Sequence, residues 1–252
     1  VPAVMEEIKS MLHLDVMTVT GKTLGENLEE LKADGFYDKC DGYLKKWGLK
    51  RTDVIRTFEE PIGTDGTVAI LRGNLAPEGS VVKHSAVPKE MFQAVLKAKP
   101  FDCEEDAIEA VISHKIQPGD AVFIRYEGPK GSGMPEMFYT TEAISSDPEL
   151  GKTIALITDG RFSGASKGPA IGHVSPEAAD GGPIALVEED DLIKIDIPGR
   201  VLEIIGVKGK ELPKEEVERI LAERKKAWKP KAPKYTKGIL KIYSEHAVSP
   251  MK

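Results

Sequence analysis

From Gly66 onward the chain consists of short runs of β-branched and other apolar residues, each bounded by glycine, proline or aspartate. Such runs are typical of β-strands, because branched side chains pack well on a pleated surface and the bounding residues favour turns. Several runs follow one another with no helical stretch between them, so strict strand–helix alternation does not fit. We therefore predict a mixed β-sheet or barrel with helices packed outside it. The predicted strands lie in residues 67–73, 80–87, 120–128, 153–160, 184–199 and 200–209.

Apolar residues at helical spacing predict helices around this sheet. Two lie between strands, at Lys89–Lys99 and Glu104–Ser113, and the second begins with an acidic turn that suits the helix dipole. Residues 213–227 form the clearest amphipathic helix, with a proline at its start. The Pro/Lys-rich stretch after Trp228 is predicted to lie over the body as a strap and to end in a short helix near Ile239–Tyr243.

The N-terminal quarter of the chain has a different texture. Residues 2–12 and 22–33 have helical spacing, with a strand or extended segment between them. Residues 34–53 are polar, aromatic and irregular, and we interpret them as a surface insertion with room for one short helix. We therefore predict that residues 1–60 are a helical lead-in and insertion, forming the end of a preceding domain or a linker. Residues 61–252 are predicted to form the main domain.

Composition narrows the class of protein. The 252 residues carry a net charge of −6, which disfavours nucleic acid as the main partner because phosphate binding needs a concentrated basic face. No apolar run approaches the roughly 20 residues that span a bilayer, and no signal peptide is recognised, so we expect a cytoplasmic protein without membrane contact.

Cys40 and Cys103 form neither a disulfide framework nor a CxxC metal pair, and we interpret them as a surface thiol and a helix-start residue. The first residue is valine, so we expect a fragment of a longer protein.

Glu127 lies in the segment RYEGPKGSGMPEM, residues 125–137. A predicted strand delivers this carboxylate into a turn rich in glycine and proline. Glycine lets the backbone approach a ligand closely, and a carboxylate suits a hard cation such as Mg²⁺. An ordinary turn with a solvent-facing glutamate fits the same composition, so both interpretations stay open from the residues alone.

A second polar loop follows the predicted strand 153–160. Its glycines lack the spacing of a phosphate-binding loop, and the residues around Ser163 do not form a nucleophile elbow. Ser163 at a strand end suits a nucleophile or a base. His173 suits a metal ligand or a hydrogen-bonded structural residue, and the second is commoner for a lone histidine.

The segment LITDGRFSGASKGPAIGHVSPEAADGGPIALVEEDDLIKIDIPGR, residues 156–200, resembles the signature of the dihydroxyacid dehydratase family. That family also contains sugar-acid dehydratases acting on phosphogluconate, xylonate or gluconate. Further matching segments occur in the family order, so the resemblance covers nearly the whole chain. Because family members are much longer, the resemblance implies that this chain is their C-terminal half. These further segments are residues 16–28, 66–83, 118–137 and 228–243.

The resemblance implies a fold, a reaction and a set of site residues. The fold is the swivelling β/β/α domain, an α/β architecture with a mixed β-barrel and outer helices. The reaction is that of a hydro-lyase, which dehydrates a 2,3-dihydroxy acid to a 2-keto acid. Ser163 is then the base that takes the C2 proton, and Glu127 is a Mg²⁺ ligand. Substrate contacts would come from Arg161, Gly164 and Ser166.

The resemblance also implies groups outside this chain. An iron–sulfur cluster and most Mg²⁺ ligands belong to the N-terminal half of such enzymes, and Cys40 and Cys103 match none of the cluster cysteines. The implied partners are a small-molecule dihydroxy acid and the N-terminal half of the same enzyme, in a homo-oligomer when full length, and the isolated fragment is expected to be inactive. The alternative is a non-catalytic module or subunit that binds a partner chain carrying the iron–sulfur site.

Two segments bear on the substrate. We interpret two segments as loops that are longer than those of the commonest dihydroxyacid dehydratases. They are residues 34–53 and 145–151. Longer polar loops favour a sugar acid, because a larger polyol needs more hydrogen-bonding partners. The sequence therefore leans toward a sugar acid over the branched dihydroxy acids of valine and isoleucine synthesis.

Overall fold

The computed structural model describes residues 1–63, 65–164 and 166–248. The chain forms two compact units, Val1–Gly66 and Thr67–Lys252. Within the described ranges, every helix is too short or too polar to cross a bilayer. The assignment of the first unit to the end of a preceding domain stays a prediction.

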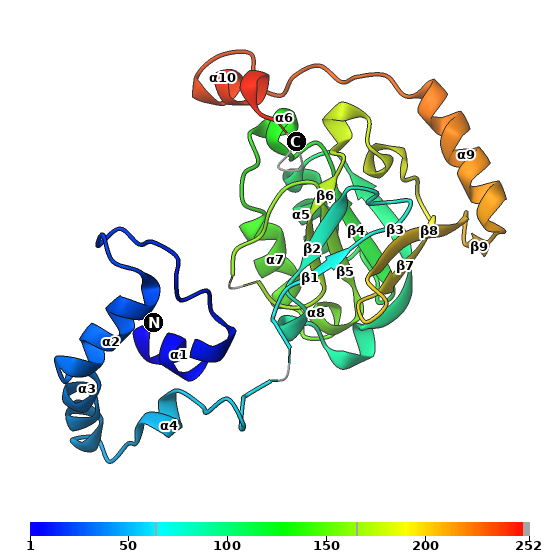
Figure 1. Cartoon of the computed structure of the whole chain (residues 1–252). Helices are drawn as coiled ribbons and strands as arrows, with labels where there is room; N and C mark the ends of the chain where they lie inside the picture. Colours follow the sequence, from blue (N-terminus) through cyan, green and yellow to red (C-terminus); the bar gives the residue numbers. More distant parts are fainter. Residues whose placement is uncertain (64, 165, 249–252) are drawn as a thin grey trace. The chain divides into compact units, whose positions relative to one another are not determined.

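The first unit is helical (Figure 1). Residues 34–53, which we predicted to be irregular, instead form two helices. One reason is a local pairing: Tyr37 is buried, and the Arg51 guanidinium lies over its ring while pairing with Asp41 at 2.7 Å. The expected extended segment before the second helix is reduced to a single bridge between Met17 and Thr23. The elements are α1 (Pro2–Glu7), η1 (Lys9–Met11), α2 (Leu24–Ala33), α3 (Phe36–Lys45) and α4 (Arg51–Val54).

The second unit is organised around one nine-stranded sheet, in the order β1-β2-β6-β5-β4-β3-β7-β8-β9. The four central strands run parallel, and antiparallel pairs flank them on both sides (Figure 1). The carboxyl ends of the four parallel strands therefore meet at one edge. The strands are β1 (Ala69–Leu71), β2 (Gly79–Val82), β3 (Gln93–Phe101), β4 (Asp120–Ile124), β5 (Ala155–Thr158), β6 (Ala170–Ser175), β7 (Leu192–Asp196), β8 (Val201–Val207) and β9 (Lys210–Glu211).

The sheet curls until its two sides meet. Arg72, just after β1, forms a parallel bridge with Val201 of β8. The Asn74 side chain continues this contact by accepting from the Ile204 N–H at 2.7 Å and donating to the Ile204 carbonyl at 2.8 Å. Gly73 between them lies so close to β8 that a Cβ atom would stand 2.2 Å from the Leu202 carbonyl oxygen. The predicted mixed barrel with outer helices is therefore confirmed.

Alternating side chains of the central strands fill two separate cores. In β4, Ala121 and Phe123 belong to the core enclosed by the sheet, while Val122 and Ile124 belong to the core under the outer helices. All five residues of this strand are buried, as expected for a parallel strand covered on both faces. The outer core is closed by α5 (Glu104–Ile112), α7 (Phe138–Ser145) and α8 (Leu150–Thr153).

The predicted helix at Lys89–Lys99 is wrong. Its residues form the short turn η3 (Lys89–Met91) and most of β3. The exposed Val95 alternates with the buried Leu96 and Ala98, which is the two-residue period of a strand. Pairing with β4 on one side and β7 on the other outweighs the helical propensity of this segment.

Other elements were missed because their local signals are weak. β6 contains Gly172 and ends in a cis Ser175–Pro176 bond, so its sequence resembles a loop. Residues 145–151, interpreted as a lengthened loop, contribute to α7 and α8. The helices at the chain's C-terminal end are confirmed, as is α5. The remaining elements are η2 (His84–Ala86), α6 (Pro129–Ser132), η4 (Ala178–Asp180), η5 (Pro183–Leu186), α9 (Lys214–Ala227) and α10 (Ile239–His246).

Closure of the barrel generates a stability prediction. Gly73→Ala should lower the free energy of unfolding by about 1–3 kcal/mol, because the added methyl group forces β1 and β8 apart. Urea denaturation followed by circular dichroism measures this. Gly42→Ala is the matched control: its added Cβ meets nothing within 4 Å, and alanine suits the middle of α3. An unchanged midpoint for Gly73→Ala would show that the closure is not required for stability.

Candidate functional site

Acidic residues follow the carboxyl ends of the parallel strands. Asp102 comes directly after β3, Glu127 follows β4, Asp159 comes directly after β5, and Glu177 follows β6. Because these strand ends share one edge of the sheet, their loops converge there, and such edges are the usual binding sites of parallel sheets. This edge is the candidate functional site.

Glu127 is the most deeply engaged carboxylate of the site. Its residue is 1% exposed. One carboxylate oxygen accepts a hydrogen bond from the Ser132 hydroxyl of α6, and the other accepts from Lys234 Nζ at 2.7 Å. A buried carboxylate needs such partners, since an unpaired charge away from water is strongly destabilising. The predicted alternative of a solvent-facing glutamate is therefore wrong.

Asp159 joins three segments through backbone hydrogen bonds. Its carboxylate accepts from the N–H groups of Glu127 at 3.0 Å, Tyr126 at 3.2 Å and Ala178 at 2.8 Å. Tyr126 has a φ of 63°, a backbone conformation that side chains seldom adopt, so this contact holds a strained turn. Asp159 thereby fixes the direction in which Glu127 leaves β4.

Burial raises the pKa of Asp159 from 3.8 to about 7, although the N–H donors of Ala178, Glu127 and Tyr126 oppose the shift. The folded state therefore holds this proton more tightly than the unfolded chain does. By linkage, the contribution of this Asp159 proton to the free energy of unfolding is complete below pH 3.8 and is lost as the pH rises toward about 7.

Glu177 anchors the turn that carries Ser132. Its carboxylate accepts from the backbone N–H of Lys130 and of Gly131, each at 3.0 Å. Gly128 lies against this carboxylate, and a Cβ atom there would stand 2.5 Å from it, so a side chain at 128 is excluded. Burial raises the pKa of Glu177, and the two N–H donors oppose this.

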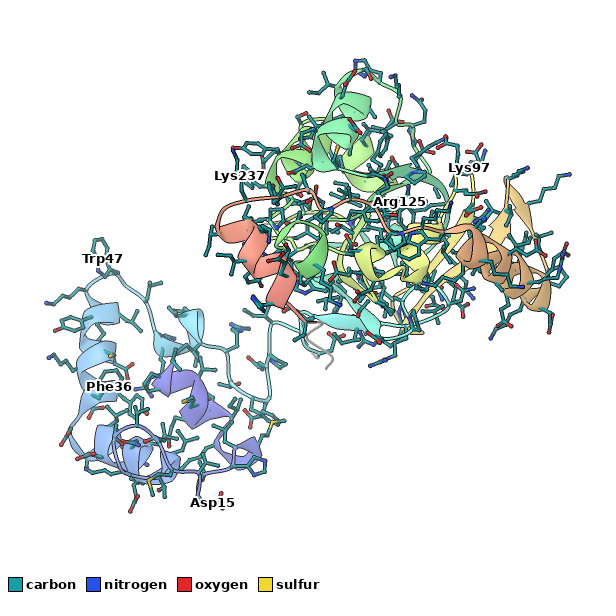
Figure 2. All side chains as sticks on the ribbon, turned by 90° about the horizontal axis from the view of Figure 1, so that it is seen from above. Asp15, Phe36, Trp47, Lys97, Arg125 and Lys237 are labelled. Carbon is teal, nitrogen blue, oxygen red and sulfur yellow. The ribbon has the colours of Figure 1, made fainter. Side chains whose placement is uncertain are left out.

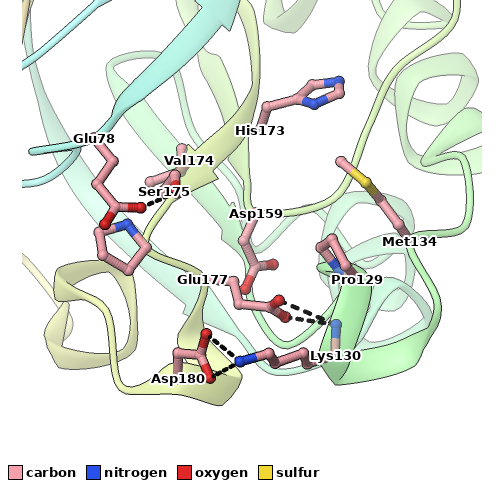
Figure 3. Close-up of a pocket in the computed structure, with 11 residues that line it drawn as sticks. Glu78, Pro129, Lys130, Met134, Asp159, His173, Val174, Ser175, Glu177 and Asp180 are labelled. Atoms are coloured by element: carbon pink, nitrogen blue, oxygen red, sulfur yellow. Dashed lines mark hydrogen bonds and ion pairs between the residues drawn. The ribbon is translucent and has the colours of Figure 1, made fainter. Parts of the chain in front are cut away.

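A cleft of about 330 Å³ opens beside these acids (Figure 3). Asp159, Glu177 and His173 line it, and Lys130 pairs with Asp180 at 2.7 Å on its rim. His173 has a positive φ of 55°, and burial together with the charge of Arg161 lowers its pKa. Its backbone N–H donates to the Gly160 carbonyl at 2.8 Å, which ties β6 to the loop after β5.

The loop after β5 carries the other predicted site residues. Arg161 is exposed, and its Nε donates to the Met134 carbonyl at 2.9 Å, so the guanidinium is held by the loop that follows Glu127. Ser163 is half-buried, and its carbonyl accepts from the Ser166 N–H at 3.2 Å. Gly164 is exposed and its carbonyl accepts from Lys83 Nζ. The loop therefore has two cationic side chains attached to it.

None of the site residues implied by the family resemblance lines the 330 Å³ cleft, whereas His173 does. Glu127 and the start of the Ser163 loop nevertheless lie together, because a Cβ atom on Gly160 would stand 3.0 Å from the Glu127 carbonyl. The sequence analysis missed Asp159, Glu177 and Lys234 as members of the site. The only local signal for the first was its position directly after a buried strand.

The oxygen and sulfur donors of this chain differ in how well they fit the implied cofactors. Glu127 and the Ser132 hydroxyl are oxygen donors of the kind that Mg²⁺ prefers, so they fit one side of such a site. In the described ranges, no group of three or more His, Cys, Asp or Glu side chains is placed to hold a metal ion. An iron–sulfur cluster does not fit this chain on its own: its sequence contains only Cys40 and Cys103, whereas such clusters are held by about four thiolates, and burial raises the pKa of the Cys103 thiol, which disfavours the thiolate.

The hydrogen bonds of Asp159 generate a second prediction. Asp159→Asn should lower the free energy of unfolding by about 1–3 kcal/mol at pH 5, because an amide NH₂ cannot accept from one of the buried N–H groups. The difference from wild type should shrink at pH 8, where burial of the ionised carboxylate opposes wild-type folding. Denaturant titrations at both values measure this, with the exposed Asp15→Asn as control (Figure 2). A difference that grows with pH would contradict the raised pKa.

Comparison with known proteins identifies the family. The family model for the dihydroxy-acid/6-phosphogluconate dehydratase C-terminal domain matches residues 53–252. The dihydroxy-acid dehydratase of Agathobacter rectalis is 51% identical over 245 residues, which are 96% of this chain and 39% of the relative. The dihydroxy-acid dehydratase of Acetivibrio thermocellus is 48% identical, over 97% of this chain and 40% of the relative. That of Methanosarcina barkeri is 51% identical, over 81% of this chain and 35% of the relative. The chain thus spans about two fifths of the length of these relatives. On these matches it belongs to the dihydroxy-acid/6-phosphogluconate dehydratase family and corresponds to its C-terminal domain.

Proposed function

We propose that the protein containing this chain removes water from a 2,3-dihydroxy acid to form a 2-keto acid. In this proposal Ser163 is the base and Glu127 is this chain's metal ligand. The observation that carries it is the placement of both residues at the carboxyl ends of the adjacent parallel strands β4 and β5. Membership of the family supplies the reaction class. The iron–sulfur ligands and the other metal ligands would lie outside this chain.

In the proposed reaction the substrate loses a proton from C2 and a hydroxide from C3, which together make one water molecule. The Ser163 oxygen takes the proton from C2, the electron pair forms the C2–C3 double bond, and the C3–O bond breaks. The hydroxide takes up one proton, which balances the proton taken from C2, and leaves as water. The resulting enol then loses its O–H proton and gains one at C3, which gives the 2-keto acid. Mg²⁺, when bound, would polarise the substrate oxygens as a Lewis acid.

A serine hydroxyl is a weak base at neutral pH and needs nearby positive charge. Arg161, held at the Met134 carbonyl, and Lys83, held at the Gly164 carbonyl, are the cations that we propose to supply it. The Ser166 N–H is already donated to the Ser163 carbonyl, so its hydroxyl is the group left for the substrate. Arg161, Gly164 and Ser166 are therefore proposed to surround the base and the substrate.

The proposed substrate is a dihydroxy acid of the kind in the relatives' names. The sugar-acid leaning of the sequence analysis rested on two lengthened loops, and one of them, residues 34–53, turns out to be largely helical. Each of the three relatives above is named dihydroxy-acid dehydratase. The shared name of these relatives and the helical structure of residues 34–53 both favour a branched dihydroxy acid over a sugar acid.

A substrate panel tests the reaction class and the substrate together. We expect the complete protein, with its cofactors reconstituted, to convert 2,3-dihydroxyisovalerate to the 2-keto acid at least about tenfold better in kcat/KM than xylonate or gluconate. Detection of the keto acid by derivatisation measures this. A preference for the sugar acids would reverse the substrate proposal but keep the dehydratase. Turnover of neither class would contradict the function.

The role of Ser163 generates a separate prediction. Ser163→Ala should lower kcat by roughly 10²–10⁴-fold, as expected when a positioned base is removed. Metal content, measured by elemental analysis, should stay at the wild-type value. Ser146→Ala is the matched control, because that serine is exposed and its hydroxyl donates to the Ala143 carbonyl of its own helix end. Wild-type turnover in Ser163→Ala would refute the base assignment.

A further inference from the structure

The contact between Lys234 and Glu127 joins residues 107 positions apart in the sequence. Lys234 lies on the Pro/Lys-rich strap between α9 and α10, whereas Glu127 lies at the carboxyl end of β4. The two partners differ sharply in exposure: the Glu127 side chain is 1% exposed and the Lys234 side chain 35%. The buried partner is fixed by its surroundings, and the partially exposed partner reaches it from outside.

The strap is attached on both sides of Lys234. Before it, the Trp228 indole N–H donates to the Tyr126 hydroxyl at 3.2 Å, and the Lys231 ammonium lies 4.5 Å from the centre of the Tyr126 ring. After it, α10 packs on α6, with Leu240 against Gly133. The backbone of the strap therefore stays in place if the Lys234 side chain alone moves.

A second acceptor for the Lys234 ammonium lies close by. Glu105 Oε2 is 3.9 Å from Lys234 Nζ, and the Glu105 side chain is 74% exposed. A lysine stem is flexible and carries a point charge, so the ammonium can turn from one carboxylate to the other without a change in the backbone. The geometry thus contains a buried position and a surface position for the same charge.

Both carboxylate oxygens of Glu127 are engaged, one by Ser132 and one by Lys234. A cation that binds Glu127 must approach one of these oxygens. Ser132 is neutral and can remain as a hydrogen-bond donor. Lys234 is positively charged, so it and a divalent cation repel each other at so short a separation, with little water to screen them.

We propose that Lys234 is the counter-cation of Glu127 in the metal-free protein, and that a divalent cation binding to Glu127 displaces the ammonium toward Glu105. The proposal rests on the role of Glu127 as a metal ligand. Lys234 pairs with the buried carboxylate and orients it while no metal is bound, and the cation then takes over that role. Lys234 is accordingly a positioning residue whose contact is exchanged during metal loading.

The direct test is the chemical reactivity of Lys234. The complete protein is stripped of divalent cations with a chelator and treated with acetic anhydride with and without Mg²⁺, in the absence of substrate. Peptide mass spectrometry then gives the acetylation rate of each lysine. Release from a buried partner should raise the Lys234 rate about fivefold or more on Mg²⁺ addition. The exposed Lys237 of the same strap should react at one rate in both conditions (Figure 2).

Three variants separate this proposal from the proposed function. Lys234→Met should tighten Mg²⁺ binding about tenfold by calorimetry, because a competing positive charge is removed. Lys237→Met removes the same charge three positions along the strap and should leave the affinity within about twofold. Glu127→Gln should weaken Mg²⁺ binding and make the Lys234 acetylation rate high whether or not Mg²⁺ is present.

A Lys234 rate that does not rise with Mg²⁺, while Glu127→Gln weakens Mg²⁺ binding, overturns the exchange and leaves the metal role of Glu127 intact. Weaker Mg²⁺ binding in Lys234→Met also overturns the exchange. Unchanged Mg²⁺ binding in Glu127→Gln overturns the metal role of Glu127 and the exchange with it, whereas the base role of Ser163 is unaffected.

Discussion

The carboxylate of Asp159 is the interaction on which the geometry of the site depends. It stands at the end of β5 and accepts hydrogen bonds from the turn after β4 and from η4 after β6. Three loops from adjacent parallel strands therefore meet at one acceptor group. Because each donor would otherwise be a buried N–H without a partner, any shift of one loop is opposed by the other two. The direction of Glu127 and the start of the Ser163 loop are set together.

This convergence needs a sheet that does not bend at the site. The parallel strands are buried on both faces, by the barrel core on one side and by α5, α7 and α8 on the other. The contact of Arg72 and Asn74 with β8 closes the sheet, so its curvature is fixed on the side away from the parallel strands. The loops at the carboxyl edge thus carry the candidate functional groups on a rigid support, which is the usual arrangement in such folds.

The parts of the fold that depend on local pattern could be predicted from the sequence. The apolar runs of β4 and β5 and the loops after them were identified, so Glu127 and Ser163 were placed at strand ends. β3 was missed because its spacing also suits a helix, and only pairing with β4 and β7 decides the matter. The part played by Asp159 could not be predicted, since its three donors come from residues 19 to 33 positions away. A hydrogen-bond acceptor is recognised only when the fold has brought its donors together.

The pairing of Glu127 with a lysine rather than an arginine has a physical meaning. A permanently buried carboxylate is best held by an arginine, whose planar fork binds both oxygens, as Arg224 does for the fully buried Asp191 elsewhere in this chain. Glu127 instead shares its oxygens between a hydroxyl and a single lysine on a strap, and that lysine has a second carboxylate within 3.9 Å. One chain therefore contains both arrangements. The bidentate pair docks α9 onto the body, and the divided pair lies where the parallel strands end and where we propose that the charge is exchanged.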